Sequence, residues 1–357
     1  MPDRFDASTA FIAEIRSAQF AVTDWLRRAE GKMLGRLGFD PQECPFRRVV
    51  SGPFWHLRAY GDQQAGLSLL IVPAPIKRPY IWDLAPEISV VGACLRQGLN
   101  VFLLEWNEPS AEMPPRGLKH YTEAIADCVT HISGQGEEDP FLMGHSLGGT
   151  LAAIYSALSA RLRGLVLIGA PLCFDRASSR FRNELVSIVP TGFANGALVP
   201  GSLLTEASVL ASPETFIWER LRDAALSLID PAVWPTLLRV ERWGFDEVPL
   251  PGRLVSELVE LLYRDDLFFR GALEIDARPI GPDHVKVPLL AVVNTADEVA
   301  PFGSIAPFTD AVRARATKII DYPGEAGVGL QHLALLIGRE AHARIWPEIF
   351  SWMFSVA

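Results

Sequence analysis

Short apolar runs alternate with amphipathic patterns over the first half of the chain. The runs are nearly free of polar residues, and each is too short for a buried helix; they cover residues 67–72, 101–104, 141–143 and 165–168. Such runs are typical of strands covered on both faces, as in a parallel sheet. Apolar positions at helical spacing lie between them, in residues 89–97, 117–132 and 147–160. The alternation predicts an α/β fold with a mostly parallel sheet and helices on both faces.

The rhythm breaks after residue 171 and returns near the C-terminus. Prolines and glycines become frequent between residues 172 and 285, among them Pro190, Gly192 and Gly196, and helical runs remain only at 215–229 and 254–263. Apolar strand patterns reappear at 287–293 and 318–322, followed by a helix over 339–354. We therefore predict a core of residues 46–171 and 286–357 with an inserted cap of residues 172–285. A second independent domain is the alternative, which the nested return of the pattern disfavours.

The two stretches before the first buried run have different patterns. Residues 47–60 contain two short runs with a break at Ser51-Gly52-Pro53, which indicates a strand pair at a sheet edge. Residues 1–45 form an N-terminal helical segment, in which apolar side chains recur at helical spacing: Phe11, Ile12, Ile15, Val22, Trp25, Leu26, Met33 and Leu34. This stripe must be buried on the same chain or on a partner, and we expect packing on the same chain.

Composition narrows the class of protein. The chain has 357 residues, 49% of them hydrophobic, and a net charge of −9, which disfavours a disordered chain and a general nucleic-acid binder. The four cysteines form no C-x-x-C pair, which favours free thiols in a reducing compartment: Cys44, Cys94, Cys128 and Cys173. Charged residues interrupt any signal-peptide pattern, and no apolar run reaches transmembrane length, so we expect a cytoplasmic protein.

A single turn gives the first chemical clue. Residues 144–148 read Gly-His-Ser-Leu-Gly, between a predicted strand and a predicted helix. This G-x-S-x-G form in that setting predicts a nucleophile elbow, in which Ser146 occupies a strained turn above the sheet. Gly144 and Gly148 then allow the strand and the helix to approach closely. A glycine-rich turn without chemistry is the alternative, which the flanking strand and helix disfavour.

An activated serine needs a base, and the base needs an acid that fixes its tautomer. In the α/β-hydrolase fold these follow the serine in the order acid, then histidine. Asp297 comes just after one predicted strand and His332 comes after the next, so we predict the triad Ser146, Asp297 and His332. Glu298 is the alternative acid. We assign His145 to packing and His342 to the surface, and the remaining histidines are less well placed: His56, His120, His131 and His284.

The oxyanion hole requires two backbone donors. The first is the N–H of Leu147, the residue after the nucleophile, and the second comes from the loop after the strand of residues 67–72. Pro75 has no N–H, which leaves Ala74 or Ile76, and we choose Ile76. Because the histidines show no metal-ligand spacing with acids or thiols, we predict neither a metal nor a cofactor.

Several stretches resemble polyhydroxyalkanoate synthases. The segment LLIVPAPIKRPYIWDL (69–84), the strand ending in Glu105-Trp106 and the stretch from VERW to VPLPG (240–252) are similar to parts of that family. Arg78-Pro79-Tyr80 looks most like the shorter, class III catalytic subunits. The resemblance implies an α/β-hydrolase fold and acyl transfer from coenzyme A to a growing polyester.

Three positions differ from the family pattern. The family carries a cysteine where Ser146 stands, a histidine where Glu298 stands, and Gly-His where Gln331-His332 stands. A serine ester is more stable than a thioester, so its onward transfer needs strong help from a base. We therefore expect a serine acyl-enzyme that hydrolyses esters or thioesters of short acyl or hydroxyacyl groups. The alternatives are a polyhydroxyalkanoate synthase that uses 3-hydroxyacyl-CoA, and a non-catalytic accessory protein.

The same reasoning fixes the expected partners. We expect a small acyl ester or thioester as substrate, with coenzyme A only as part of an acyl-CoA. A homodimer and a subunit related to polyester synthesis remain open as protein partners, and no nucleic acid is expected.

Overall fold

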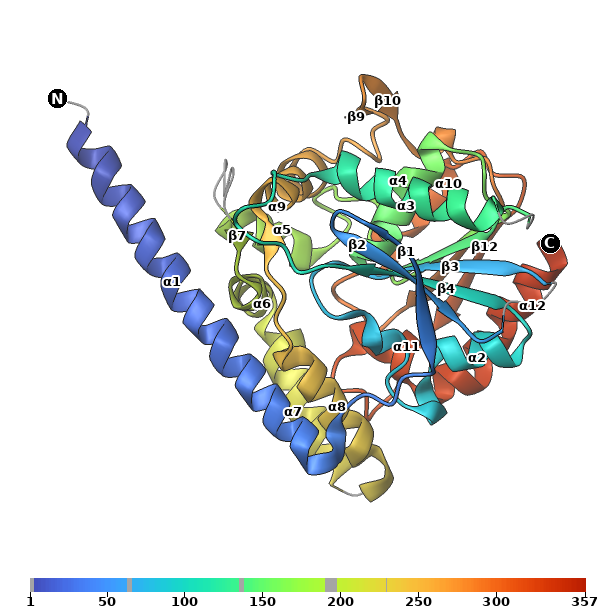
Figure 1. Cartoon of the computed structure of the whole chain (residues 1–357), viewed down its shortest axis with the longest axis horizontal. Helices are drawn as coiled ribbons and strands as arrows, with labels where there is room; N and C mark the ends of the chain where they lie inside the picture. Colours follow the sequence, from blue (N-terminus) through green and yellow to red (C-terminus); the bar gives the residue numbers. More distant parts are fainter. Residues whose placement is uncertain (1–2, 63–65, 135–137, 190–197, 229) are drawn as a thin grey trace.

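A twisted sheet organises the protein in a computed structural model that describes residues 3–62, 66–134, 138–189, 198–228 and 230–357 (Figure 1). Side chains are described from residue 18 onward, except at 231. Phe11, Ile12 and Ile15, with Pro190, Gly192 and Gly196, therefore lie outside this description. Among the described residues, eight strands join in the order β1-β2-β4-β3-β5-β6-β11-β12. Their bounds are β1 Phe46–Gly52, β2 Trp55–Tyr60, β3 Ser68–Val72, β4 Asn100–Trp106, β5 Phe141–His145, β6 Gly164–Ile168, β11 Leu289–Asn294 and β12 Thr317–Tyr322.

The central strands run in the same direction, so their carboxyl ends lie together along one side of the sheet. Every pair from β4 to β12 is parallel, whereas β1 and β2 pair antiparallel at the other end. The expected edge pair at 47–60 is confirmed as β1 and β2. The segment between β6 and β11 adds no strand to this sheet; its short strands pair elsewhere, as β7 (Leu198–Val199) with β8 (Leu250–Pro251) and β9 (Leu273–Ile275) with β10 (Arg278–Ile280).

Alternate side chains of each central strand enter opposite cores. In β3, Leu70 and Val72 join the core under α3 (Leu118–Ser133), α4 (Leu147–Leu158) and α10 (Ala306–Ala311), while Leu69 and Ile71 join the other. That second core is covered by α2 (Val90–Arg96), α11 (Ala334–Ile337) and α12 (Trp346–Val356), as Figure 1 shows. Burial on both faces explains why these strands are continuously apolar. The expected α/β fold with a mostly parallel sheet and helices on both faces is confirmed.

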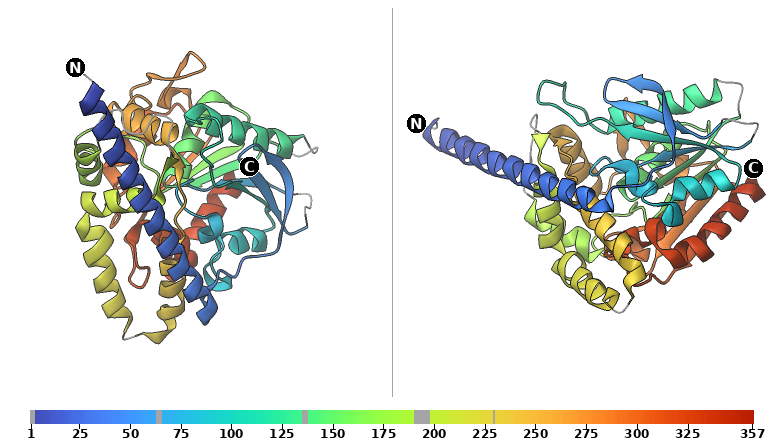
Figure 2. Two further views of the ribbon diagram at one scale, coloured as in Figure 1. Left: turned by 60° about the vertical axis from the view of Figure 1, so that its left-hand side comes forward. Right: turned by 60° about the horizontal axis from the view of Figure 1, so that its bottom comes forward.

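Helices make up most of the segment between β6 and β11. Their bounds are α5 Arg180–Ile188, α6 Gly201–Ala211, α7 Glu219–Ser227, α8 Trp234–Phe245 and α9 Gly252–Glu257, with helical turns at Glu214–Trp218 and Leu258–Arg264. Only the runs at 215–229 and 254–263 were expected from the sequence. The two views of Figure 2 place α6, α7 and α8 together at one side of the sheet.

The N-terminal helix differs from the sequence expectation. α1 (Asp3–Leu34) lies along α8, and its N-terminal end projects away from the body in Figure 1 and in the right-hand view of Figure 2. Its apolar stripe is not buried, since Val22, Trp25 and Met33 remain more than half exposed. The docked side is polar: the Asp24 carboxylate accepts the N–H groups of Gly201 and Ser202 at the start of α6. The prediction that the stripe packs on the same chain is wrong for these residues, because hydrogen bonds and ion pairs dock the helix.

The close approach of β3, β5 and α4 leaves no room for side chains at the glycines of the turn. A Cβ at Gly148 would lie 2.7 Å from the Pro73 carbonyl carbon and 2.8 Å from the Ala74 nitrogen, and still closer to the Val72 oxygen. A Cβ at Gly144 would lie 2.6 Å from the Gly148 backbone. The glycines of the G-x-S-x-G turn are therefore required by backbone packing.

This packing predicts the effect of adding one methyl group. Gly148→Ala is expected to lower the free energy of unfolding by about 3 kcal/mol, because rigid backbone must move to admit the methyl. Gly244→Ala in α8 is the control, since its Cβ would meet no atom within 4 Å; a gain of about 0.5–1 kcal/mol is expected there. Urea unfolding of both variants measures the difference. Equal stabilities would contradict the close approach.

Candidate active site

Ser146 stands at the apex of the turn between β5 and α4. Its backbone has φ 54° and ψ −133°, a conformation that a residue with a side chain rarely adopts. The Ser146 N–H donates to the Ile168 carbonyl of β6, and the Ser146 carbonyl accepts from the Thr150 N–H of α4, both at 3.1 Å. The turn is thereby tied to both neighbouring elements, and the serine side chain is half-buried at the carboxyl edge of the sheet. This is the geometry of a nucleophile elbow.

His332 and Asp297 meet at the same edge. Asp297 follows β11, His332 lies beyond β12, and His332 Nδ1 is 2.6 Å from Asp297 Oδ2. The His332 ring also lies 4.6 Å, centroid to centroid, from the ring of His145, the residue before the serine. His332 Nε2 is buried and has no hydrogen-bond partner in the described part of the chain. The structure thus brings the predicted base and acid together beside the elbow, with one ring nitrogen of the base unused.

The electrostatics of Asp297 suit the role of a fixed acid. Burial alone would raise the pKa of its carboxyl, but the charge and hydrogen bond of His332 outweigh burial and hold that pKa below its usual value. The N–H groups of Val299 and Ala300 also donate to Asp297 Oδ1, at 2.8 and 3.3 Å. A carboxylate with this many donors stays ionised and holds the Nδ1–H tautomer of His332.

Glu298, the alternative acid, points elsewhere. Its Oε2 accepts hydrogen bonds from Ser212 and Thr215, at 3.1 and 2.9 Å. The carboxylate therefore joins the loop after β11 to the segment between α6 and α7, and Asp297 alone of the two contacts His332.

His145 does more than pack, which the sequence assignment missed. It is 6% exposed, and its Nε2 lies 2.8 Å from the His332 carbonyl oxygen. Because a carbonyl only accepts, His145 donates from Nε2. Burial and the neighbouring His332 charge lower the pKa of His145 from 6.5 to about 3. His145 thus fastens the backbone of the base to the strand that carries the serine.

Asn294, at the end of β11, has a similar function that sequence reasoning also missed. Its Nδ2 donates to the Gln331 carbonyl at 2.7 Å, and its backbone carbonyl accepts from the Asp297 N–H at 3.1 Å. In the sequence, the signal for this function was an amide side chain directly after an apolar run. His342, assigned to the surface, is half-buried and bonds the Leu336 carbonyl at 2.8 Å.

The predicted oxyanion donors lie on two different elements. Leu147 is the first residue of α4, where N–H groups have no partner within the helix. Ile76 lies in the turn after β3, next to the Pro73–Ala74 backbone that packs on Gly148. The pairing of Leu147 with Ile76 as oxyanion donors stays a prediction.

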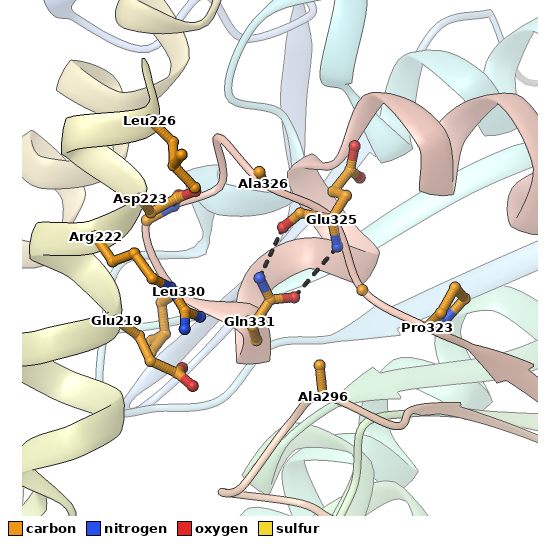
Figure 3. A pocket seen from close by; sticks show the side chains of 12 residues that line it. Glu219, Arg222, Asp223, Leu226, Ala296, Pro323, Glu325, Ala326, Leu330 and Gln331 are labelled. Carbon is orange, nitrogen blue, oxygen red and sulfur yellow. Dashed lines mark hydrogen bonds between the residues drawn. The ribbon is translucent and has the colours of Figure 1, made fainter. Parts of the chain in front are cut away.

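A cleft of about 340 Å³ lies between α7 and the loop that precedes His332 (Figure 3). Glu219, Arg222 and Asp223 line it from α7, and Ala296 and Gln331 line it from the core. Asp223 accepts the N–H groups of Gly327 and Gly329, while Gln331 and the Glu325 backbone bond each other, as Figure 3 shows for the latter pair. The loop that carries the base is therefore held by α7 on one side and by its own hydrogen bonds on the other.

Solved structures with similar folds define the class of protein. The enol-lactonase from Burkholderia xenovorans matches with a TM-score of 0.53 at 15% identity, over 87% of this chain and 100% of that one. The monoacylglycerol lipase of Paleococcus ferrophilus matches with a TM-score of 0.51 at 16% identity, over 85% and 99%. At these identities the likeness concerns the fold alone. The protein has an α/β-hydrolase fold, as expected from the sequence.

Curated sequence relatives point to one branch of that class. Poly(3-hydroxyalkanoate) polymerase subunit PhaC of Haloferax mediterranei is 29% identical over 350 residues, 95% of this chain and 68% of that protein. The same-named subunits of Haloarcula marismortui and Allochromatium vinosum are 29% and 25% identical over 82% and 88% of the chain. The chain spans 61% of the Haloarcula protein and 89% of the Allochromatium one. No protein-family model matches. The chain is thus a relative of poly(3-hydroxyalkanoate) polymerases, and the resemblance seen in the sequence is confirmed.

The described part of the chain has no membrane-spanning helix and no metal-binding cluster, and its cysteines are free. No helix there combines the length and apolarity needed to cross a bilayer. Histidine, cysteine and acidic side chains do not gather there in groups of three that could hold a metal ion. The cysteines are free thiols; Cys44 is half-buried and bonds Asp83, and the others are buried.

The low pKa of His145 predicts how stability depends on pH. In the unfolded chain this histidine takes up a proton near pH 6.5, whereas in the folded protein it does so only near pH 3. The unfolded state therefore binds more protons between these values. Stability present above pH 6.5 is lost as pH falls, by about 1.4 kcal/mol per pH unit from this group.

His145→Gln tests this dependence, since its amide can still donate to the His332 carbonyl. Urea unfolding between pH 5 and 8 measures the free energy of unfolding of both proteins. As pH falls, this free energy should decrease less steeply for the variant, because its unfolding takes up about one proton fewer. Identical slopes for the two proteins would contradict a buried neutral His145.

Proposed function

We propose that the protein is a serine-dependent acyltransferase that takes 3-hydroxyacyl groups from coenzyme A and transfers them to a hydroxyl acceptor, as in polyester synthesis. The observation that carries the proposal is the His332–Asp297 hydrogen bond of 2.6 Å beside an elbow that bears Ser146. The substrate class rests on the similarity to poly(3-hydroxyalkanoate) polymerases over most of the chain. Ser146 is the nucleophile, His332 the base and Asp297 the acid that orients it.

The first half-reaction forms an acyl-enzyme. Ser146 Oγ attacks the thioester carbonyl carbon while its proton passes to His332 Nε2, the ring nitrogen that has no hydrogen-bond partner among the described residues. Among the described residues Nε2 has no hydrogen-bond partner, so in this mechanism its hydrogen bond with Ser146 forms as the substrate binds. The tetrahedral oxyanion is held by the N–H groups of Leu147 and Ile76. When it collapses, the carbon–sulfur bond breaks and the coenzyme A sulfur leaves with the proton from His332.

The second half-reaction releases the acyl group. A hydroxyl group of another hydroxyacyl chain attacks the serine ester, and His332 again accepts the proton. Oxygen replaces oxygen at the carbonyl carbon, so the step is nearly balanced, and Ser146 recovers its proton from His332. Water in place of the hydroxyl acceptor gives a free acid instead of a polymer.

Hydrolysis is the second candidate, and the sequence alone placed it first. The observation that favours it is Ser146 itself, because an oxygen ester persists longer than a thioester and gives water more time to attack. The similarity to polymerases supports transfer over hydrolysis. A non-catalytic accessory function is the third hypothesis, and the Asp297–His332 hydrogen bond argues against it, since a protein without catalysis has no need of an oriented buried base.

Removal of the nucleophile tests catalysis. Ser146→Ala should lower the release of coenzyme A from 3-hydroxybutyryl-CoA by roughly 10³-fold or more, because no acyl-enzyme forms. Thiol release, free acid and polymer are measured together with the wild-type protein. Polymer that depends on Ser146 supports transfer, whereas free acid alone supports hydrolysis. Unchanged thiol release by the variant would refute a serine acyl-enzyme.

The two neighbouring carboxylates should differ sharply in their effect. Asp297→Asn is expected to lower kcat by roughly 10⁴-fold with little change in KM, because the amide favours the wrong His332 tautomer. Glu298→Gln is the matched control, since its partners are hydroxyl groups near α6 and α7, and a loss below about tenfold is expected. Steady-state kinetics on an acyl-CoA or a p-nitrophenyl ester separates the two. A larger loss for Glu298→Gln would assign the acid to that residue.

A further inference from the structure

A buried carboxylate outside the candidate site joins distant parts of the chain. Glu247, just after α8, is fully buried. Its Oε2 is 2.6 Å from Lys77 Nζ, and its Oε1 is 2.9 Å from Arg27 Nε and 3.0 Å from Thr205 Oγ1. The catalytic mechanism makes no use of this group. One buried side chain thus connects α1, the turn after β3 and α6.

A second carboxylate also joins α1 to the loop after β3. Glu108, after β4, lies 2.6 Å from Arg78 Nη2 and 3.0 Å from Arg28 Nη2. Consecutive arginines of α1, Arg27 and Arg28, are therefore linked through one acid each to consecutive cations of the loop, Lys77 and Arg78. Glu108 is 36% exposed, so the solvent screens this bridge more than the buried one at Glu247.

The linked loop is the one that carries the proposed oxyanion donor. At its start, Pro73 accepts a hydrogen bond of 2.8 Å from Trp106 Nε1, and its backbone packs on Gly148. At its end, Lys77 pairs with Glu247 both through a backbone bridge and through the ion pair. The turn at residues 75–76 is thus fixed at both ends, which leaves the Ile76 N–H little freedom to move.

The N-terminal helix holds the far side of this arrangement. Arg27 Nη2 donates to the Gly244 carbonyl at 3.3 Å, and Arg28 Nε donates to the Glu247 carbonyl at 2.9 Å. Lys77 Nζ also donates to Gly244, at 2.7 Å. The end of α8 is therefore held between α1 and the loop, while the apolar side of α1 faces solvent. This explains why the polar side of the helix is the docked one.

We propose that Arg27–Glu247–Lys77, supported by Arg28–Glu108–Arg78, is a positioning device through which α1 fixes the oxyanion loop. The inference rests on the proposed function for the role of Ile76. Donors that are already in place stabilise the transition state without reorganisation, whereas a donor displaced by about 1 Å can cost roughly 10²-fold in rate. These residues act through the loop and do not touch the substrate.

Replacement of Arg27 tests the device in the full-length chain. Arg27→Met should lower kcat by roughly 10-fold to 10²-fold with KM within about twofold, because the loop loses order while the acyl-binding surface stays. Arg27→Lys should recover most of kcat, since an ammonium group can still reach Glu247. Arg28→Met should have a smaller effect than Arg27→Met. Lys32→Met, at an exposed position of the same helix, is the matched control and should match the wild-type protein.

Amide hydrogen exchange gives a second readout that needs no activity. Peptides that cover residues 73–78 should exchange faster in Arg27→Met than in Lys32→Met, while peptides of β5 and β11 keep their protection. Thr205→Ala, which removes one donor to Glu247, keeps the test possible if Arg27→Met does not fold; it should shift exchange in the same direction.

The outcomes separate this inference from the proposed function. A wild-type protein without Ser146-dependent activity refutes the proposed function, and faster exchange at 73–78 in Arg27→Met would still support the link between α1 and the loop. Unchanged exchange at 73–78, unchanged kcat in an active protein, or equal loss of protection throughout the sheet would each overturn the inference.

Discussion

The strained backbone of Ser146 is the constraint on which the arrangement depends. For a non-glycine residue, a backbone with φ 54° and ψ −133° costs on the order of 1–3 kcal/mol of strain. Such a conformation persists only where the surrounding structure fixes it. Here the surroundings are two hydrogen bonds to β6 and α4 and the contact of Gly148 with the end of β3. The elbow therefore fixes the start of α4, and with it the position of the loop after β3, before any catalytic side chain is considered.

The proposed base, His332, and acid, Asp297, are held by hydrogen bonds from several elements. Hydrogen bonds reach the backbone around His332 from His145 of β5, from Asn294 of β11 and, through Gly329, from Asp223 of α7. Each comes from a different element, so no single strand positions the base. A buried imidazole between a carboxylate and a neutral histidine needs such support, since its own ring makes only one hydrogen bond in the described structure.

The sequence predicted the parts of the fold in which local pattern and tertiary burial agree. Central parallel strands are buried on both faces, so their apolar runs were visible, and the order of Ser146, Asp297 and His332 followed from where those strands end. The helices α5, α6 and α8 were missed because glycines and prolines are frequent in the segment around them, residues 172–285. The docked side of α1 was predicted wrongly because hydropathy ignores buried ion pairs such as Arg27 with Glu247.

The functions of His145, Asn294 and Glu247 were not predictable, for a common reason. Each makes a decisive contact with a residue more than thirty positions away, and that contact leaves no trace in local spacing. Hydrogen bonds to backbone carbonyls, as made by His145 and Asn294, also place no demand on the identity of the residue they reach. Only the tertiary structure reveals such contacts.

An oxygen nucleophile places greater demands on these supports than a sulfur one. A thiol is partly ionised near neutral pH, whereas a serine hydroxyl is not, so in the proposed mechanism Ser146 loses its proton to His332 as it attacks. The proton can pass only if the imidazole keeps its position and tautomer throughout, and the carbonyl oxygen must meet donors that are already in place. The anchoring of His332 by separate elements and the proposed positioning of residues 73–78 by α1 and α8 would meet these two demands. Under the proposed function, the serine and the polar docking of the N-terminal helix are therefore linked. A less reactive nucleophile at residue 146 requires groups around it that are already held in position.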